Sequence, residues 1–60
     1  MYFYVLNFSN RTFKGFQFPE QVTAEINNLL ANNVNEDEIE IINASDECAR
    51  MSVKEFNNLF

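Results

Sequence analysis

The stretch Tyr2-Phe-Tyr-Val-Leu-Asn-Phe8 decides the fold. It is rich in aromatic and β-branched residues and lacks helical spacing, so it predicts a β-strand. Side chains alternate between the two faces of a strand, and here both sets are apolar. The even-numbered set is Tyr2, Tyr4, Leu6 and Phe8, and the odd-numbered set is Phe3 and Val5. We therefore expect a central strand that is covered on both faces.

The next residues predict the second half of a β-hairpin. Ser9-Asn-Arg11 has turn chemistry, and residues 12–18 alternate well enough to form the returning strand. Phe13 is out of phase with Phe16 and Phe18, so we expect a β-bulge at Lys14-Gly15, where the only glycine of the chain stands.

An amphipathic helix is predicted over residues 20–32. Pro19 suits the first turn of a helix, and Glu20 is favourable near the positive end of the helix dipole. Four apolar residues then follow at helical spacing and form one stripe: Val22, Ile26, Leu29 and Leu30. Asn32-Asn33 is expected to end the helix, because Asn tolerates the left-handed conformation.

The last third of the chain predicts one strand, one loop and one short helix. In residues 38–42 two isoleucines alternate with two glutamates, which is typical of an edge strand with one solvated face. Residues 43–51 are polar and predict a loop, which is our first candidate for a contact site. Ser52 and Glu55 match a capping box that would open a helix through Phe60.

These elements predict a single small α+β domain over residues 1–60, in the order β-β-α-β-α. With the first strand central, the sheet is three-stranded and antiparallel, with strand order 2-1-3. The main helix would cover one face of the sheet. The other face is left to the C-terminal helix or to a second molecule, since an exposed aromatic face is an unusually large apolar patch for a soluble monomer.

The residue types argue against an enzyme. Histidine is absent, so the usual proton carrier near neutral pH is missing. Cys48 is the single cysteine and lies beside Asp46 and Glu47, which disfavour its thiolate. The acidic residues 33–44 do not match a calcium loop, and the lone Gly15 excludes a phosphate-binding glycine loop. We therefore expect no catalytic residue, no cofactor and no metal site.

Charge and hydropathy bear on partners and location. The net charge is −5, which opposes direct binding to nucleic acid. Residues 1–8 lack the basic leader and cleavage site of a signal peptide, and no apolar run approaches the ~20 residues of a membrane span. The expectations are a cytoplasmic protein and no contact with membranes.

The surplus of aromatic residues favours a protein-interaction module, which we expect to be a homodimer formed through the second sheet face. An alternative is an acidic inhibitor that imitates nucleic acid and is encoded by a phage or mobile element. Salt separates the two, because only the mimic should lose its partner steeply as ionic strength rises. The candidate interaction residues are Tyr2, Tyr4, Phe13, Phe16, Glu38, Glu40, Asp46, Glu47 and Arg50.

Overall fold

The fold begins with a regular β-hairpin. The computed structural model describes residues 2–45, 47 and 49–60. Strands β1 (Phe3–Asn7) and β2 (Thr12–Phe16) pair antiparallel in an unbroken register, from Phe3 opposite Phe16 to Asn7 opposite Thr12. The odd-numbered residues of β1 are buried and the even-numbered ones are half-buried, so β1 is central as predicted but is covered by the chain on one face only.

The bulge expected at Lys14-Gly15 is wrong. Lys14 lies opposite Val5 and Gly15 lies opposite Tyr4, with no extra residue between them. The expectation assumed that Phe13 had to share a face with Phe16, whereas the regular pleat places these two rings on opposite faces. Gly15 has another role, because a Cβ atom there would lie 2.9 Å from ring carbons of Tyr2.

Helix α1 (Pro19–Ala31) agrees with the predicted helix to within one residue at each end. Pro19 occupies the first turn, and Asn33 adopts the left-handed conformation (φ 64°) just beyond the helix. Of the predicted apolar stripe, Val22 and Ile26 are buried in the core and Leu29 packs against it, whereas Leu30 is exposed. Lys14 Nζ of β2 lies 3.4 Å from Glu25 Oε2, which ties the edge of the sheet to the helix.

The sheet has four strands in the order β2-β1-β3-β4, so the prediction of three strands is wrong. A 3-10 turn, η1 (Glu36–Glu38), leads into β3 (Ile39–Asn43), and β4 (Ala49–Ser52) follows. All neighbouring pairs are antiparallel, and the predicted order 2-1-3 is retained within the larger sheet. Because β3 pairs with both β1 and β4, it is a central strand and not the predicted edge strand.

The predicted loop over residues 43–51 is wrong at both ends, because Asn43 belongs to β3 and residues 49–51 belong to β4. Between them, Ala44, Ser45 and Glu47 are described and lie in a turn. The prediction missed β4 because Ala49-Arg-Met-Ser52 contains no β-branched or aromatic residue. Part of this segment, including Asp46 and Cys48, lies outside the described residues.

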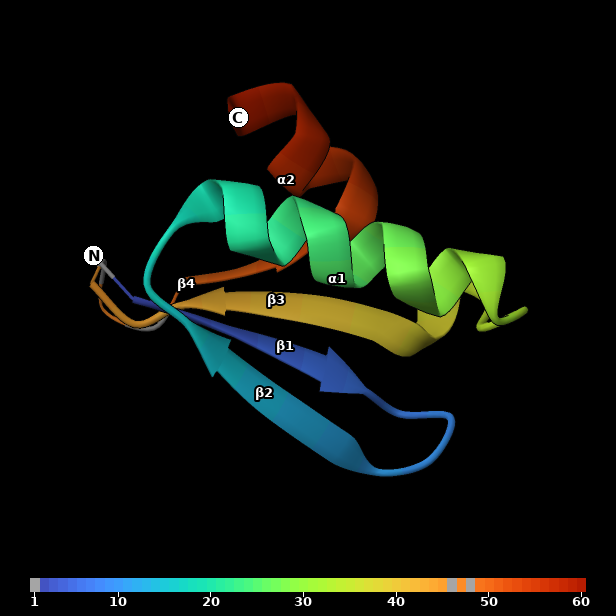
Figure 1. Cartoon of the computed structure of the whole chain (residues 1–60). Coiled ribbons are helices and arrows are strands. Elements are labelled where there is room, and N and C mark those ends of the chain that lie inside the picture. Colours follow the sequence, from blue (N-terminus) through green and yellow to red (C-terminus); the bar gives the residue numbers. More distant parts are fainter. Residues whose placement is uncertain (1, 46, 48) are drawn as a thin grey trace.

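Helix α2 (Val53–Leu59) begins at the predicted capping box. Ser52 Oγ accepts a hydrogen bond from the Glu55 N–H (3.1 Å), and Glu55 Oε1 accepts one from the Ser52 N–H (3.1 Å). The helix packs on the same side of the sheet as α1, as Figure 1 shows. Its residue Phe56 is fully buried and meets Phe3 edge to face, with ring centroids 6.0 Å apart.

One core lies between the sheet and the two helices. Its buried members are Phe3, Val5, Val22, Ile26, Ile39, Ile41, Met51, Val53 and Phe56. The second face of the sheet carries no helix (Figure 1). Of the two covers that the sequence left open for this face, the C-terminal helix is excluded because it lies on the other side.

The order of elements repeats, as a hairpin and a helix followed by a second hairpin and helix. The two hairpin turns share their chemistry. Asn7 Oδ1 accepts a hydrogen bond from the Ser9 N–H (2.9 Å), and Asn43 Oδ1 accepts one from the Ser45 N–H (3.0 Å). Four residues after each asparagine the backbone is left-handed, at Arg11 (φ 58°) and at Glu47 (φ 52°).

Candidate functional site

The uncovered face of the sheet is the candidate site, and we call it the open face. Its strand residues form two rows across the four strands, because directly opposed residues share a face. One row is Gly15, Tyr4, Ile42 and Arg50, and the other is Phe13, Leu6, Glu40 and Ser52. Tyr2 and Phe8 extend β1 at its two ends with the same alternation.

The first hairpin contributes the aromatic half of the open face. Tyr2 and Tyr4 meet edge to face with ring centroids 5.2 Å apart, and Tyr4 meets Phe13 in the same way at 6.2 Å. The side chain of Tyr2 lies over the backbone of Gly15, where no other residue type leaves room for it. The Tyr2 N–H donates to Ser45 Oγ (2.8 Å), which fixes the start of β1 against the turn after β3.

Large apolar side chains remain exposed on this half. The exposed fractions are 39% for Tyr2, 53% for Phe8 and 69% for Phe13. An aromatic side chain carries about 150 to 250 Å² of surface, so these three together leave roughly 240 to 400 Å² accessible to water. That area is similar to the largest apolar patch of a typical monomer, about 300 to 600 Å², which is often functional.

A hollow of about 350 Å³ lies at the turn end of the aromatic half. Its walls come from Leu6, Phe8 and Phe13, and Arg11 and Thr12 contribute its polar groups. The shape is formed by the left-handed turn at Arg11, which follows the Asn7 side-chain cap. An apolar side chain from a partner is the chemistry that such a hollow accepts.

The second hairpin contributes the ionic half of the open face. Arg50 Nη1 lies 3.3 Å from Glu40 Oε1, and the two charges sit on the central strand β3 and the edge strand β4. The Arg50 side chain is 70% exposed, so solvent screens this pair and it adds little stability. Ile42 lies between the ionic half and the aromatic half.

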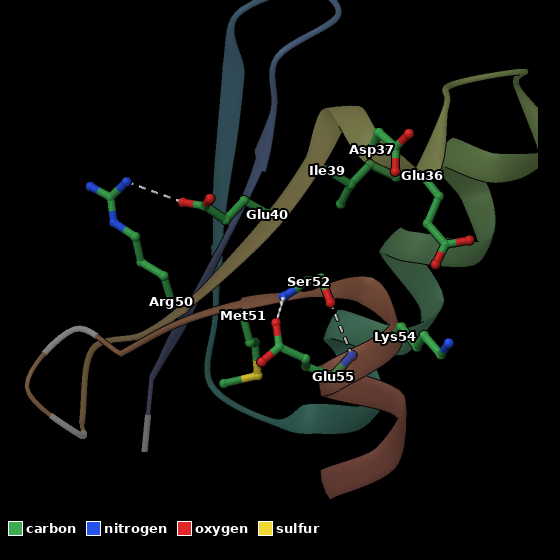
Figure 2. Close-up of a pocket in the computed structure, with 9 residues that line it drawn as sticks. All are labelled: Glu36, Asp37, Ile39, Glu40, Arg50, Met51, Ser52, Lys54 and Glu55. Carbon is green, nitrogen blue, oxygen red and sulfur yellow. Dashed lines mark hydrogen bonds and ion pairs between the residues drawn. The ribbon is translucent and has the colours of Figure 1, made fainter.

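A second hollow of about 440 Å³ lies beside β4 and the start of α2 (Figure 2). Its charged lining residues are Glu36, Asp37, Glu40, Arg50, Lys54 and Glu55. The carboxylates do not converge, because Glu40 pairs with Arg50 and Glu55 is turned back to the Ser52 N–H, as Figure 2 shows. No group of three metal-ligating side chains is present among residues 2–45, 47 and 49–60.

The structure brings together some of the residues predicted from the sequence and separates others. Tyr2, Tyr4 and Phe13 share the aromatic half, and Glu40 and Arg50 form the ionic half. Phe16 lies on the covered face, where it packs against the core. Glu38 is half-buried in η1, where its carbonyl accepts a hydrogen bond from the Phe8 N–H (2.8 Å).

Two further predicted residues, Asp46 and Glu47, lie in the sequence between β3 and β4. Glu47 is exposed there, at its left-handed position, and Asp46 lies outside the described residues. Leu6, Phe8 and Ile42 were not among the predicted site residues although they lie on the open face. The alternation of β1 places Leu6 and Phe8 with the two tyrosines, so this signal was present in the sequence.

Comparison with known proteins adds no relative. No protein-family model, curated protein or solved structure shows significant similarity to the chain. Within the described residues, no helix has both the length and the apolar character that crossing a membrane requires. The functional argument therefore rests on the open face.

Proposed function

We propose that this chain is a small, acidic, non-catalytic protein-interaction module whose open face binds a second copy of the chain. The observation that carries the proposal is the position of both helices on one side of the sheet, which leaves the aromatic half uncovered. The aromatic half is apolar on this side of the sheet, and neither helix covers it.

The size of the molecule sets how much of it a second copy would cover. A standard specific interface covers about 800 Å² on each partner, which is nearly a fifth of the 4181 Å² surface of this chain. The Cα atoms span 29 × 20 × 17 Å, so an interface of that size takes about one whole side of the molecule. A small domain also gains stability from a second subunit, because its own core is limited.

The alternative function is an acidic inhibitor that imitates nucleic acid. It is less well supported, because the acidic side chains that line the second hollow share it with cations. Glu40 pairs with Arg50, and Lys54 lines the same hollow. Under this alternative, partner binding should weaken steeply with salt, and charge reversal at Glu38 and Glu40 should abolish it.

A matched pair of substitutions tests the proposed function. Phe13 on the open face is 69% exposed, and Phe18, the N-cap residue of α1 on the covered side, is 56% exposed. Phe13→Ser should raise the dimer dissociation constant, measured by sedimentation velocity, by roughly tenfold or more, as loss of an aromatic anchor does. Phe18→Ser should leave that constant unchanged.

Circular dichroism of both variants checks that the fold is retained. Equal effects of the two substitutions, or no effect of Phe13→Ser on a measurable dimer, would contradict a dimer formed through the open face.

A further inference from the structure

The open face is divided into an aromatic half and an ionic half, and this division restricts how two copies meet. Strands β1 and β2 place only uncharged residues on the open face, with Arg11 beyond them in the turn, whereas the second hairpin places the Glu40–Arg50 pair there. The inference below rests on the proposed function, since it concerns the geometry of the same dimer.

Two copies that pack sheet on sheet with aligned strands have two choices of twofold axis. An axis parallel to the strands lays β2 over the partner's β4 and β1 over the partner's β3. An axis perpendicular to the strands, in the plane between the sheets, lays every strand over its own copy. The strand order β2-β1-β3-β4 makes these two arrangements chemically different.

The parallel axis places the aromatic half of one copy on the ionic half of the other. Leu6 then faces the partner's Glu40, and Phe13 faces the partner's Ser52, because these residues occupy one row. Covering a charged pair with apolar side chains removes its water without adding a partner, which is costly. Tyr4 would face the partner's Ile42, but Phe13, the most exposed of the aromatic rings, would gain only the polar Ser52.

The perpendicular axis matches like with like. The aromatic half of one copy packs on the aromatic half of the other, so the exposed parts of Tyr2, Phe8 and Phe13 are removed from water together. This axis exchanges the two rows, so Glu40 lies opposite the partner's Ile42 and diagonal to the partner's Arg50, and the four charges gather at one side of the interface.

We propose that the chain forms a face-to-face homodimer about a twofold axis perpendicular to its strands, with the first hairpins packed together and the Glu40–Arg50 pairs of both copies at one side of the interface. In this dimer β2 crosses the partner's β2, and β4 crosses the partner's β4. The outer strands β2 and β4 are three strand spacings apart, which is roughly 14 Å.

Thiol crosslinking tests the axis. Phe13→Cys on β2 and Arg50→Cys on β4 are each made with Cys48→Ser, and the mass of each variant is measured before crosslinking. An equimolar mixture is then treated with a short bis-maleimide whose reach is less than the separation of β2 and β4. The proposal predicts crosslinked homodimers of both variants. It predicts no crosslinked product that joins a Phe13→Cys chain to an Arg50→Cys chain.

Each outcome is decisive. A mixed product without homodimer products shows that β2 faces β4, which overturns the axis but leaves the proposed dimer intact. Dimers that do not crosslink at all must form through another surface, which overturns both proposals. A wild-type chain that stays monomeric also overturns both proposals.

Isotope-filtered NOE spectra give a second measurement on the unsubstituted protein, in case Phe13→Cys weakens the dimer. Contacts between copies should join Phe13 to the partner's first hairpin. Contacts from Phe13 to Ser52 or Arg50 of the other copy would overturn the axis.

Discussion

At the scale of single residues, the packing of Tyr2 on Gly15 shows what the glycine of β2 allows. The ring of Tyr2 lies on the backbone of Gly15, in a position that a Cβ atom would occupy. The same ring meets Tyr4, so the absence of a side chain at Gly15 allows the aromatic half to extend along β1. The sequence shows that the glycine is special, but not that the reason is a ring on its surface.

The substitution Gly15→Ala should stabilise the fold by less than the roughly 0.5 to 1 kcal/mol that Ala gains over Gly within a strand, because displacing the exposed Tyr2 ring has a cost. In a Tyr2→Ser background the cost should disappear. There, Ala at a strand position is expected to be favourable by roughly 0.5 to 1 kcal/mol relative to Gly. A double-mutant cycle from urea denaturation measures the coupling, and additive effects would show that the ring does not rest on this glycine.

The pair Ser52 and Glu55 shows what short-range sequence patterns predict well. The capping box was expected from two residues three positions apart, and both of its hydrogen bonds are present. The pattern is reliable because all its partners lie within one turn, so no tertiary contact is needed to complete it.

Ser52→Ala should cost about 1 kcal/mol of folding stability, since the N-terminal N–H groups of α2 lose an acceptor. Ser9→Ala is the matched control. Ser9 is exposed, and it bonds Asn7 through its backbone N–H rather than its hydroxyl, so its loss should change stability by less than about 0.5 kcal/mol. Equal effects in thermal melts would argue against the cap.

At the scale of elements, the sequence predicted those with local signals and missed the one without. The first strand, the main helix and the short helix follow from aromatic content, helical spacing and caps. β4 has no such signal, and it forms because the turn after Asn43 brings it beside β3, with Met51 reaching the core. Glu40 correctly indicated that β3 has one solvated face. A solvated face does not identify an edge strand, because central strands of a sheet with an open face have one too.

Helix α2 buries Val53 and Phe56 in the core, and Phe56 is the larger of the two. Phe56 is fully buried against Phe3, whereas Leu59 on the same helix is 68% exposed. Phe56→Ala should cost about 3 to 5 kcal/mol. That is similar to the whole stability of about 3 to 5 kcal/mol expected from a core of this size, so the variant should be largely unfolded by circular dichroism.

Leu59→Ala is the control on the same helix. It should remain folded, with a change of less than about 0.5 kcal/mol. A folded Phe56→Ala variant would show that α2 is not needed to hold the sheet together.

At the scale of the whole molecule, the uneven covering of the sheet is the main result. Two helices share one face, and the other face combines an aromatic half with one ion pair. The sequence predicted that the first strand is apolar on both sides, but which face each helix takes depends on long-range packing. Only the structure shows that the two helices lie together and that Phe16 belongs to the covered face.

Association changes how stability should be described. If a second copy covers the open face, the folded state gains free energy by mass action, and the melting temperature rises with protein concentration. Burial of the exposed rings against a second copy would then add to the limited core of the 60-residue chain.

The most direct test of the open face as a self-association surface is the mass of the unsubstituted protein by light scattering on a sizing column, across a wide concentration range. The account predicts a mass that rises with concentration to twice the 7.0 kDa of the chain. A mass that stays at 7.0 kDa at every concentration would contradict it.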